Sequence, residues 1–329
     1  MSDKKNIAIV ATGGTIAANH ASQTGLGDYT VDQPIDQLIQ AIPALGQIAN
    51  VSAHEVCNID SRDMNFALQH RLIRQVQLLL ARTDVDGVVI THGTDTLEET
   101  ALLLHWCIKS TKPVVITGAM RPASALSADG ALNLYHAVLV ASSADAHGIG
   151  TLVLLNDTIF SARFVQKTHT STPDAFAAPA TGALGLVSNG VVYINAAPRR
   201  PFGASSALVL PTNEVLPQVD ILFDHVDANP NLYKACVLSG AKAIVIATLG
   251  NGSLSPAARA GAEYAAQHQV VCIRASRVAN GAVSASEQDN SYHTLPAHQF
   301  HPIAARTLTA LVLAQHAKQS DLAYYLRHY

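Results

Sequence analysis

Charged residues are scarce in this chain of 329 residues, at 14% of the total. Lys and Arg number 21 against 24 Asp and Glu, with no basic run, which argues against the clustered Lys and Arg of a nucleic-acid surface. The four cysteines form no C-x-x-C pair, so neither a disulfide framework nor a cysteine metal site is indicated. No apolar run approaches the length of a membrane span, so we expect no membrane partner.

Signals for targeting and for bound cofactors are also missing. Residues Met1 to Asn6 lead directly into a short apolar run, without the longer apolar region and cleavage site of a signal peptide. We therefore expect a cytoplasmic location for the chain as written, and a periplasmic one if a leader has been removed. The 15 histidines include no H-E-x-x-H motif, and residues 12–17 lack the G-x-G-x-x-G spacing, so we expect no metal and no dinucleotide cofactor.

The sequence does contain enough apolar residues, 49%, for a sizeable core. Short apolar runs alternate with segments of helical periodicity, which predicts an α/β fold with a mainly parallel sheet and right-handed crossovers. The strands predicted in the first part are 7–11, 51–57, 88–91, 113–117 and 151–155, and Asn189-Gly190 predicts a hairpin over 184–194. We expect a larger N-terminal catalytic domain at 1–197, a linker at 198–217 and a smaller C-terminal α/β domain at 218–329.

Two predicted helices begin with capping signals. Asp63 is the expected N-cap of a helix over 64–82, whose apolar residues lie on one face. Thr96 and Glu99 have the spacing of a capping box before the apolar run 101–104. A capping box gives Thr96 and Glu99 a structural role and leaves the preceding Thr94 and Asp95 unexplained.

Polar residues follow the ends of several predicted strands. Thr15 comes after the strand 7–11 and the pair Gly13-Gly14, which permits a sharp turn. The carboxyl ends of parallel strands share one edge, where ligands bind, so we expect the segments that follow them to converge. The residues concerned are Thr15, Ser61, Thr94, Asp95, Ala119 and Lys167. From the strand and turn alone, Thr15 is either a nucleophile or an ordinary turn residue.

The residue types at this edge are suited to acyl transfer. A threonine hydroxyl is a weak nucleophile and needs a neighbouring base or a proton relay. Lys167 with Asp95 could provide that relay for Thr94, or the two could form an ordinary ion pair. Backbone N–H groups at 93–94 and 118–119 are candidates for an oxyanion hole.

Two threonine motifs resemble the signatures of a known family. Ala11-Thr-Gly-Gly-Thr15-Ile-Ala17 and Ile90-Thr-His-Gly-Thr94-Asp95-Thr-Leu-Glu-Glu-Thr-Ala101 are similar to the two signature motifs of bacterial-type L-asparaginases. The resemblance extends over the whole chain and is greatest to the type II asparaginase and glutaminase-asparaginase branch. It implies a two-domain α/β hydrolase that converts L-asparagine to aspartate and ammonia without a cofactor, with glutaminase as a side activity. It also implies a homotetramer built from intimate dimers.

The resemblance also implies roles by position. Thr15 resembles the acylated nucleophile and Tyr29 its partner on a closing loop. The second triad, which would handle the proton and the attacking water, is Thr94, Asp95 and Lys167. The implied substrate-binding residues are Ser61, Arg62, Thr94, Asp95 and Ala119, with Asn251 and Glu287 contributed by a neighbouring subunit.

Arg62 departs from the family pattern, because type II members usually carry Gln or Glu there. A long cation could strengthen binding of the substrate α-carboxylate or crowd the pocket, so Arg62 bears on the preference between asparagine and glutamine. Two other functions stay open. One is the asparaginase-like subunit of a tRNA amidotransferase, against which the acidic balance argues. The other is a sensor that retains the pocket without turnover.

Overall fold

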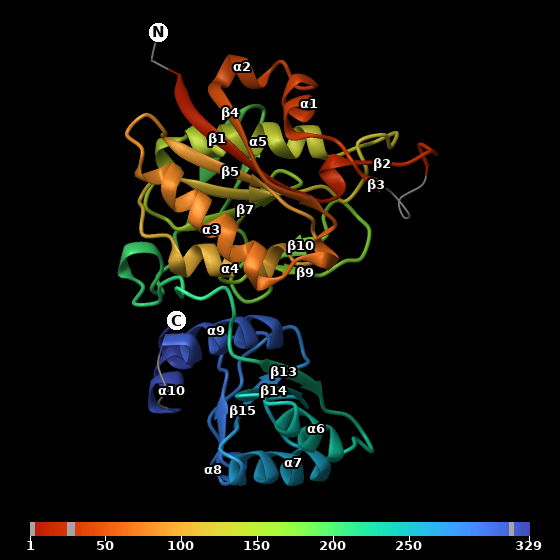
Figure 1. Cartoon of the computed structure of the whole chain (residues 1–329), viewed down its shortest axis with the longest axis vertical. Coiled ribbons are helices and arrows are strands. Elements are labelled where there is room, and N and C mark those ends of the chain that lie inside the picture. Colours follow the sequence, from red (N-terminus) through yellow and green to blue (C-terminus); the bar gives the residue numbers. More distant parts are fainter. Residues whose placement is uncertain (1–3, 25–29, 316–318) are drawn as a thin grey trace. The chain divides into compact units, whose positions relative to one another are not determined.

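The computed structural model describes residues 4–24, 30–315 and 319–329, apart from the side chains of 319 and 320. The chain forms two compact units, residues 1–209 and 210–329 (Figure 1). The division lies within the segment 198–217. Because contacts are dense inside each unit and the units divide in one connecting segment, each builds its own core.

The first unit is built on an eight-stranded sheet in the order β12-β11-β8-β7-β6-β5-β1-β4. Five neighbouring strands, from β7 through β4, pair in parallel, and the pairs β7–β8, β8–β11 and β11–β12 are antiparallel. The expected mainly parallel sheet is therefore confirmed. The strands are β1 (Lys5–Gly13), β4 (Ala49–Ile59), β5 (Gly87–Thr91), β6 (Val114–Thr117), β7 (Thr151–Leu155), β8 (Thr158–Ser161), β11 (Gly185–Ser188) and β12 (Val191–Ile194).

The strand order creates a switch point between β1 and β5. From β1 the chain adds β4 on one side, then returns to place β5, β6 and β7 in turn on the other side. Connections leaving β1 and β5 therefore diverge, and ligands of doubly wound sheets bind in the crevice at that point. Thr15 follows β1, and Thr94 with Asp95 follows β5. The topology thus places both threonine motifs at the switch point.

Helices cover both faces of this sheet (Figure 1). One face carries α1 (Ile35–Gln40), α2 (Leu45–Ile48) and α5 (Gly130–Ser142), which share one apolar core with β1. The other face carries α3 (Phe66–Ala81) and α4 (Leu97–Cys107). Burial on both faces explains why the inner strands read as continuous apolar runs, since no side of such a strand meets water.

One expected helix start is wrong, and the other keeps its residue but not its capping bond. Asn65, not Asp63, is the N-cap of α3, and its Oδ1 accepts the Leu68 N–H at 3.1 Å. Asp63 belongs instead to a 3₁₀ turn, η2 (Ser61–Asp63). Thr96 is the N-cap of α4, but its side chain makes no capping bond. Its hydroxyl donates to the Ser61 carbonyl at 3.0 Å, so a contact between loops has replaced the expected capping box.

Short elements complete the first unit. The hairpin of β11 and β12 turns at Asn189 and Gly190, with φ of 49° and 74°, as the Asn-Gly pair predicts. We expected Lys167 to follow the end of a parallel strand. Instead, β8 intervenes, and Lys167 lies on β9 (Gln166–Lys167). The remaining elements are β2 (Ala18–Asn19), β3 (Thr30–Val31), β10 (Phe176–Ala177), which pairs antiparallel with β9, and the 3₁₀ turns η1 (Thr15–Ala17), η3 (Ala144–Ala146) and η4 (Gly203–Ser205).

The second unit is a smaller α/β domain. Its sheet, in the order β13-β14-β15-β16, is parallel throughout. The strands are β13 (Val219–Phe223), β14 (Ala243–Thr248), β15 (Val271–Ser276) and β16 (Thr294–Pro296). The helices are α6 (Asn231–Leu238), α7 (Pro256–Gln267), α8 (Glu287–Asn290), α9 (Pro302–Gln315) and α10 (Gln319–His328). Among the described residues, no helix combines the length and apolar character needed to cross a bilayer.

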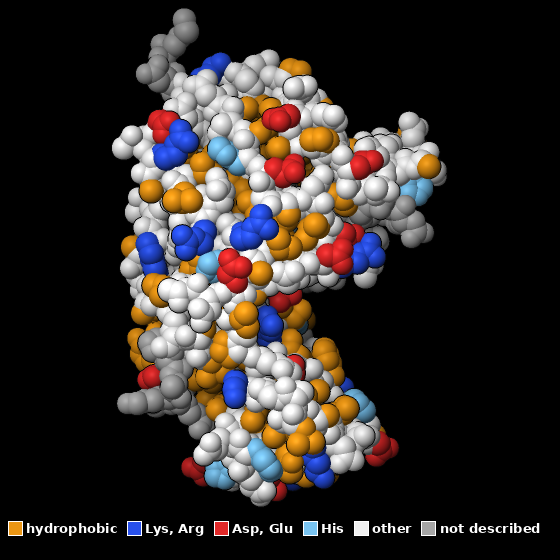
Figure 2. Space-filling view, in the orientation of Figure 1, with side chains coloured by type: hydrophobic (Ala, Val, Ile, Leu, Met, Phe, Trp, Pro, Cys, Tyr) orange, Lys and Arg blue, Asp and Glu red, His pale blue; other side chains and the backbone are white. Residues whose placement is uncertain are grey.

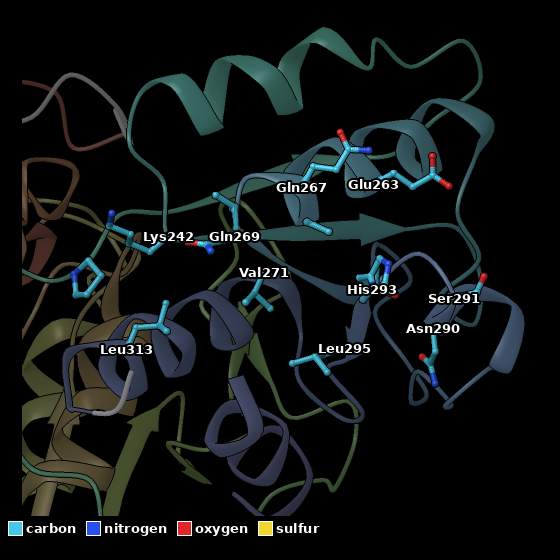
Figure 3. A pocket seen from close by; sticks show the side chains of 14 residues that line it. Lys242, Glu263, Gln267, Gln269, Val271, Asn290, Ser291, His293, Leu295 and Leu313 are labelled. Atoms are coloured by element: carbon cyan, nitrogen blue, oxygen red, sulfur yellow. The ribbon is translucent and has the colours of Figure 1, made fainter. Parts of the chain in front are cut away.

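A groove of about 1230 Å³ runs along the second unit (Figure 3). Lys242, Gln269 and His293, which line it, each precede a strand of the small sheet and so mark its amino-terminal edge. Ligands of parallel sheets bind at the carboxyl-terminal edge. Asn251 lies in the loop at that opposite edge and does not line the groove, whereas the last residue of α8, Asn290, does.

Candidate active site

Glycines shape the turn that presents Thr15. Gly13 and Gly14 end β1 with φ of 94° and 83°, a region that residues with a Cβ rarely adopt. The Gly14 N–H donates to the Ile59 carbonyl at 2.8 Å, which ties the turn to the end of β4. Thr15 then begins η1 and is 5% exposed. The turn therefore delivers a largely buried hydroxyl to the carboxyl-terminal edge of the sheet.

The loops after β1, β4, β5 and β6 touch one another through glycines. A Cβ on Gly14 would overlap the Gly93 backbone, and a Cβ on Gly93 would overlap the Ser61 side chain. A Cβ on Gly118 would overlap the His92 carbonyl and lie 3.3 Å from Thr94 Cγ2. These close approaches bring the backbone next to Thr15 directly against the backbone next to Thr94. The structure thus gathers segments that lie far apart in sequence.

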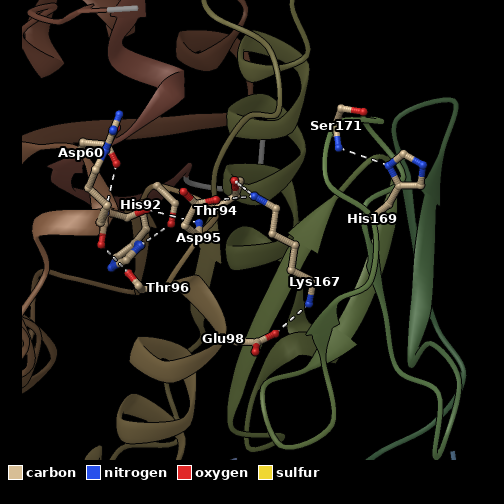
Figure 4. A network of polar contacts seen from close by, with 12 residues as sticks. Asp60, His92, Thr94, Asp95, Thr96, Glu98, Lys167, His169 and Ser171 are labelled. Atoms are coloured by element: carbon tan, nitrogen blue, oxygen red, sulfur yellow. Dashed lines mark hydrogen bonds and ion pairs between the residues drawn. The ribbon is translucent and has the colours of Figure 1, made fainter. Parts of the chain in front are cut away.

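Lys167 joins Thr94 to Asp95 (Figure 4). Its Nζ donates to Thr94 Oγ1 at 2.8 Å and to Asp95 Oδ1 at 2.6 Å. The Lys167 side chain is 18% exposed and that of Asp95 is 59% exposed, so the pair lies at a surface with one member mostly buried. Because the amine bonds a hydroxyl as well as the carboxylate, the arrangement is a three-member chain and not an isolated ion pair.

Ser61 and Arg62 lie beside this chain but differ in their surroundings. Ser61 is 3% exposed, and its Oγ accepts the Asp95 N–H at 3.2 Å. The Arg62 side chain is 70% exposed, and its Nη2 pairs with Asp60 Oδ2 at 2.7 Å. The hydrogen bond from the Arg62 guanidinium lowers the pKa of the Asp60 carboxyl. Ser61 is thus a fixed member of the site, and Arg62 is anchored at its margin by Asp60.

His92 bonds the backbone of the loop that carries Thr94. It is fully buried, and burial lowers the pKa of the imidazole to about 4. Nδ1 lies 2.7 Å from the Gly93 carbonyl, which can only accept, so Nδ1 carries the proton and Nε2 accepts from Thr100 Oγ1 at 3.0 Å. Thr100 Oγ1 in turn accepts from Gln69 at 2.9 Å. His92 is therefore neutral at pH 7, with both nitrogens bonded within the fold.

Glu98 is a buried acid that the sequence reasoning missed. It lies in the first turn of α4, is 8% exposed, and its Oε2 accepts the Lys167 backbone N–H at 2.7 Å. Burial raises the pKa of the Glu98 carboxyl to about 7. The capping-box spacing directed attention to Glu99, and Glu98 stands next to it in the same motif. A burial pattern in α4 could have singled it out, because most of that helix is apolar.

Ala119, the residue expected at the amide end of the substrate, is fully buried in the loop after β6. The Asp129 carboxylate accepts the Met120 and Arg121 N–H groups at 2.9 and 3.0 Å. Asn133 donates to the Gly118 carbonyl at 3.0 Å and to Asp129. Two side chains at the start of α5 therefore bond the backbone of residues just before and just after Ala119.

Asn251 and Glu287 belong to the second unit, and both are exposed. The Asn251 side chain exchanges two hydrogen bonds with Ser284, at 2.8 and 3.2 Å. Fully buried Arg274 donates to the Gly252 carbonyl at 3.1 Å and to Asn290 of α8 at 2.9 Å. One arginine thus joins the loop of Asn251 to the helix that begins at Glu287. Tyr29 lies outside the described residues.

The fold and the site together define a class of protein: an α/β protein with the residue types of an acyl-transfer enzyme. A doubly wound sheet places two threonines, a lysine and an aspartate at its switch point, the residue types of acyl transfer through a hydroxyl. Within the part of the chain that the structure describes, no group of three or more His, Cys, Asp or Glu is arranged to hold a metal ion.

Comparisons with known proteins agree with this class. The model of the family "Asparaginase, N-terminal" matches residues 6–200, and that of the "Glutaminase/Asparaginase C-terminal domain" matches 218–326. L-asparaginase 2 of Bacillus subtilis is 42% identical over 99% of this chain and 87% of its own. Glutaminase-asparaginase of Pseudomonas fluorescens is 41% identical over 96% and 88%. A crystal structure of a probable cytoplasmic L-asparaginase from Campylobacter jejuni has a TM-score of 0.96 at 37% identity, covering 99% and 100%.

The chain belongs to the asparaginase family and is an amidohydrolase. Its relatives are of the bacterial L-asparaginase 2 and glutaminase-asparaginase kind, as the two threonine motifs indicated.

The close approach of Gly14 to Gly93 can be tested by adding one methyl group. We expect Gly14→Ala to separate the two loops and strain the turn, since both the Cβ overlap and the φ of 83° oppose it. Amidohydrolase activity should fall by about 10²-fold, as expected for a shift of roughly 1 Å in a reacting group. Gly46→Ala is the matched control, because its Cβ meets nothing within 4 Å. Equal activity in both variants would contradict the close approach.

Burial of Glu98 predicts how stability depends on pH. The pKa of the Glu98 carboxyl is about 7 in the fold against 4.5 in the unfolded chain, so the fold binds the proton more tightly. The stabilisation is complete below pH 4.5 and is lost as pH rises through 7, a change of about 3 kcal/mol. Glu98→Gln cannot titrate. The melting temperature of this variant minus that of the unmodified chain should therefore increase as pH rises from 5 to 8. Parallel curves of melting temperature against pH would show that Glu98 is not buried as an acid.

Proposed function

We propose that this protein hydrolyses L-asparagine to aspartate and ammonia through a covalent intermediate on Thr15. The observation that carries the proposal is the chain from Thr94 through Lys167 to Asp95, in a loop packed against the turn of Thr15. The names of the relatives, L-asparaginase and glutaminase-asparaginase, support the substrate class.

The first step forms an ester on Thr15. The hydroxyl oxygen attacks the side-chain amide carbon of the substrate, the C–N bond breaks, and the hydroxyl proton leaves with the amine as ammonia. Tyr29 is the proposed partner that assists Thr15. Backbone N–H groups at 93–94 and 118–119 are proposed donors to the oxyanion.

The second step uses water to release aspartate. Water attacks the ester carbon, one of its protons returns to Thr15, and the other leaves with the aspartate carboxyl group. Thr94 orients the water and takes the proton that later returns to Thr15. During the attack the Thr94 hydroxyl proton passes to Lys167 and a Lys167 proton passes to Asp95, and these transfers reverse as Thr15 leaves. The distances of 2.8 and 2.6 Å along this chain support a relay, because each transfer spans one hydrogen bond.

Ser61, Arg62 and Asp95 are the proposed ligands of the α-carboxylate and α-amino groups, with Ala119 at the amide end. Arg62 is already paired with Asp60, so a substrate carboxylate must compete with that pair for the guanidinium. This competition argues for a modest contribution of Arg62 to affinity. We propose glutamine as a slower second substrate.

We also propose a homotetramer in which Asn251 and Glu287 complete the site of a neighbouring subunit. Both side chains are exposed, and buried Arg274 holds the segments that carry them. An exposed polar residue on a fixed segment is suited to contacting a neighbour with little loss of entropy. Basic and acidic side chains are interspersed on the face drawn in Figure 2, which favours a small-molecule substrate over a nucleic-acid partner.

The direct test is ammonia release by the purified chain alone. We expect ammonia from L-asparagine, and more slowly from L-glutamine, without tRNA or a partner protein. Turnover without a partner separates the proposed enzyme from an amidotransferase subunit and from a sensor. Ammonia at the level of a heat-denatured control would reject the proposal.

Substitution of either threonine should abolish turnover. We expect Thr15→Ala and Thr94→Ala each to lower kcat on the order of 10⁴-fold, because residues that act as a unit fail together. Thr181→Ala, on an exposed loop, is the matched control and should keep its activity. A variant of Thr15 or Thr94 with near-normal kcat would remove that residue from the mechanism.

A further inference from the structure

Glu98 contacts Lys167 at its backbone and not at its amine. The Lys167 backbone N–H donates to Glu98 Oε2 at 2.7 Å, while the Nζ at the other end of the side chain bonds Thr94 and Asp95. Figure 4 shows Lys167 extended between these partners, with Glu98 at one end and Asp95 with Thr94 at the other. Lys167 is therefore held at both ends.

The segment that carries Lys167 has little regular structure of its own. Strand β9 is two residues long and, among the described strands, pairs with β10 alone, which is equally short. Beyond it, the Thr168 N–H donates to the Ala175 carbonyl at 2.7 Å. These bonds fix β9 to its own hairpin partner. The bond to Glu98 instead ties β9 to helix α4.

Glu98 and the partners of the amine belong to one continuous piece of chain. Thr94 and Asp95 lie in the loop that becomes α4, and Glu98 lies in the first turn of that helix. Ser61 accepts hydrogen bonds from the Asp95 N–H at 3.2 Å and from the Thr96 hydroxyl at 3.0 Å, so the loop before the helix is held as well as the helix. Anchoring Lys167 at both ends to this piece sets where Nζ lies relative to Thr94 Oγ1.

We propose that Glu98 is a positioning residue that sets the Lys167 amine against Thr94 for the reaction proposed above, on which this inference rests. The carboxyl group acts as a hydrogen-bond acceptor for the backbone of Lys167. It is 8% exposed, so removing it takes the acceptor of the Lys167 N–H out of a largely buried place, which is costly. The charged groups near Glu98 are Glu99 on the same helix and Lys167 itself.

Kinetics of two variants separate positioning from ionisation. Glu98→Ala removes the acceptor, and we expect kcat for asparagine to fall by about 10²-fold with little change in KM, because Nζ is displaced while the substrate ligands remain. Glu98→Gln keeps a carbonyl acceptor without a charge, and its kcat should stay within about threefold of the unmodified chain at pH 7. The same loss in both variants would overturn the proposal.

A loss of helix stability alone is tested by Leu104→Ala. Leu104 is fully buried in α4, so its truncation weakens the same helix by leaving a cavity. At a temperature where both variants are folded by circular dichroism, Leu104→Ala should keep its kcat and Glu98→Ala should not. Equal losses of kcat would assign Glu98 a structural role and overturn the proposal.

The position of the amine can be followed without any turnover. Acetic anhydride modifies uncharged, accessible amines, and mass spectrometry gives the rate at Lys167 relative to Lys5 in the same sample. We expect Glu98→Ala to raise the relative rate at Lys167 several-fold and Glu98→Gln to leave it unchanged. An unchanged rate in Glu98→Ala overturns the proposal. If the unmodified chain releases no ammonia, the proposed function fails, while the labelling still decides where Glu98 holds Lys167.

Discussion

The close packing of two glycine backbones, at Gly14 and Gly93, is the constraint on which the site depends. The first ends the turn after β1 and the second begins the loop after β5, and no side chain fits between them. Because β1 and β5 are neighbours at the switch point, their loops meet only if Gly14 carries no Cβ, and Gly93 must lack one to admit Ser61 from the loop after β4. The positions of Thr15 and Thr94 both follow from this contact.

Around this contact, buried and half-buried polar groups hold each loop through its backbone. Asp129 accepts N–H groups beside Ala119, Glu98 accepts the N–H of Lys167, and His92 bonds the Gly93 carbonyl as a neutral imidazole. The bonds of fully buried His92 and largely buried Glu98 would be costly to leave unmade. The loops are therefore held by side chains that are not among the residues proposed to react.

Much of the fold could be predicted from residue patterns. Alternating apolar runs and helical periodicity identified the parallel strands, and Asn189-Gly190 identified the hairpin, because these signals are local. The helix starts were less certain. Asp63 had the right residue type for a cap, but Asn65 makes the capping bond of α3. Thr96 is the N-cap of α4, but its hydroxyl bonds the Ser61 carbonyl in place of its own helix. Such competition depends on neighbours in space.

The sequence by itself determined the family, through two threonine motifs. It also indicated the edge of the sheet at which polar residues would gather. Both signals are local, because each lies within a short stretch of consecutive residues. Only the tertiary structure decided how Lys167 reaches Thr94, because Lys167 arrives on a short antiparallel strand and not from a parallel strand end. It also revealed Glu98, whose contact with Lys167 spans 69 positions. Burial and hydrogen bonding across such separations arise only when the chain has folded.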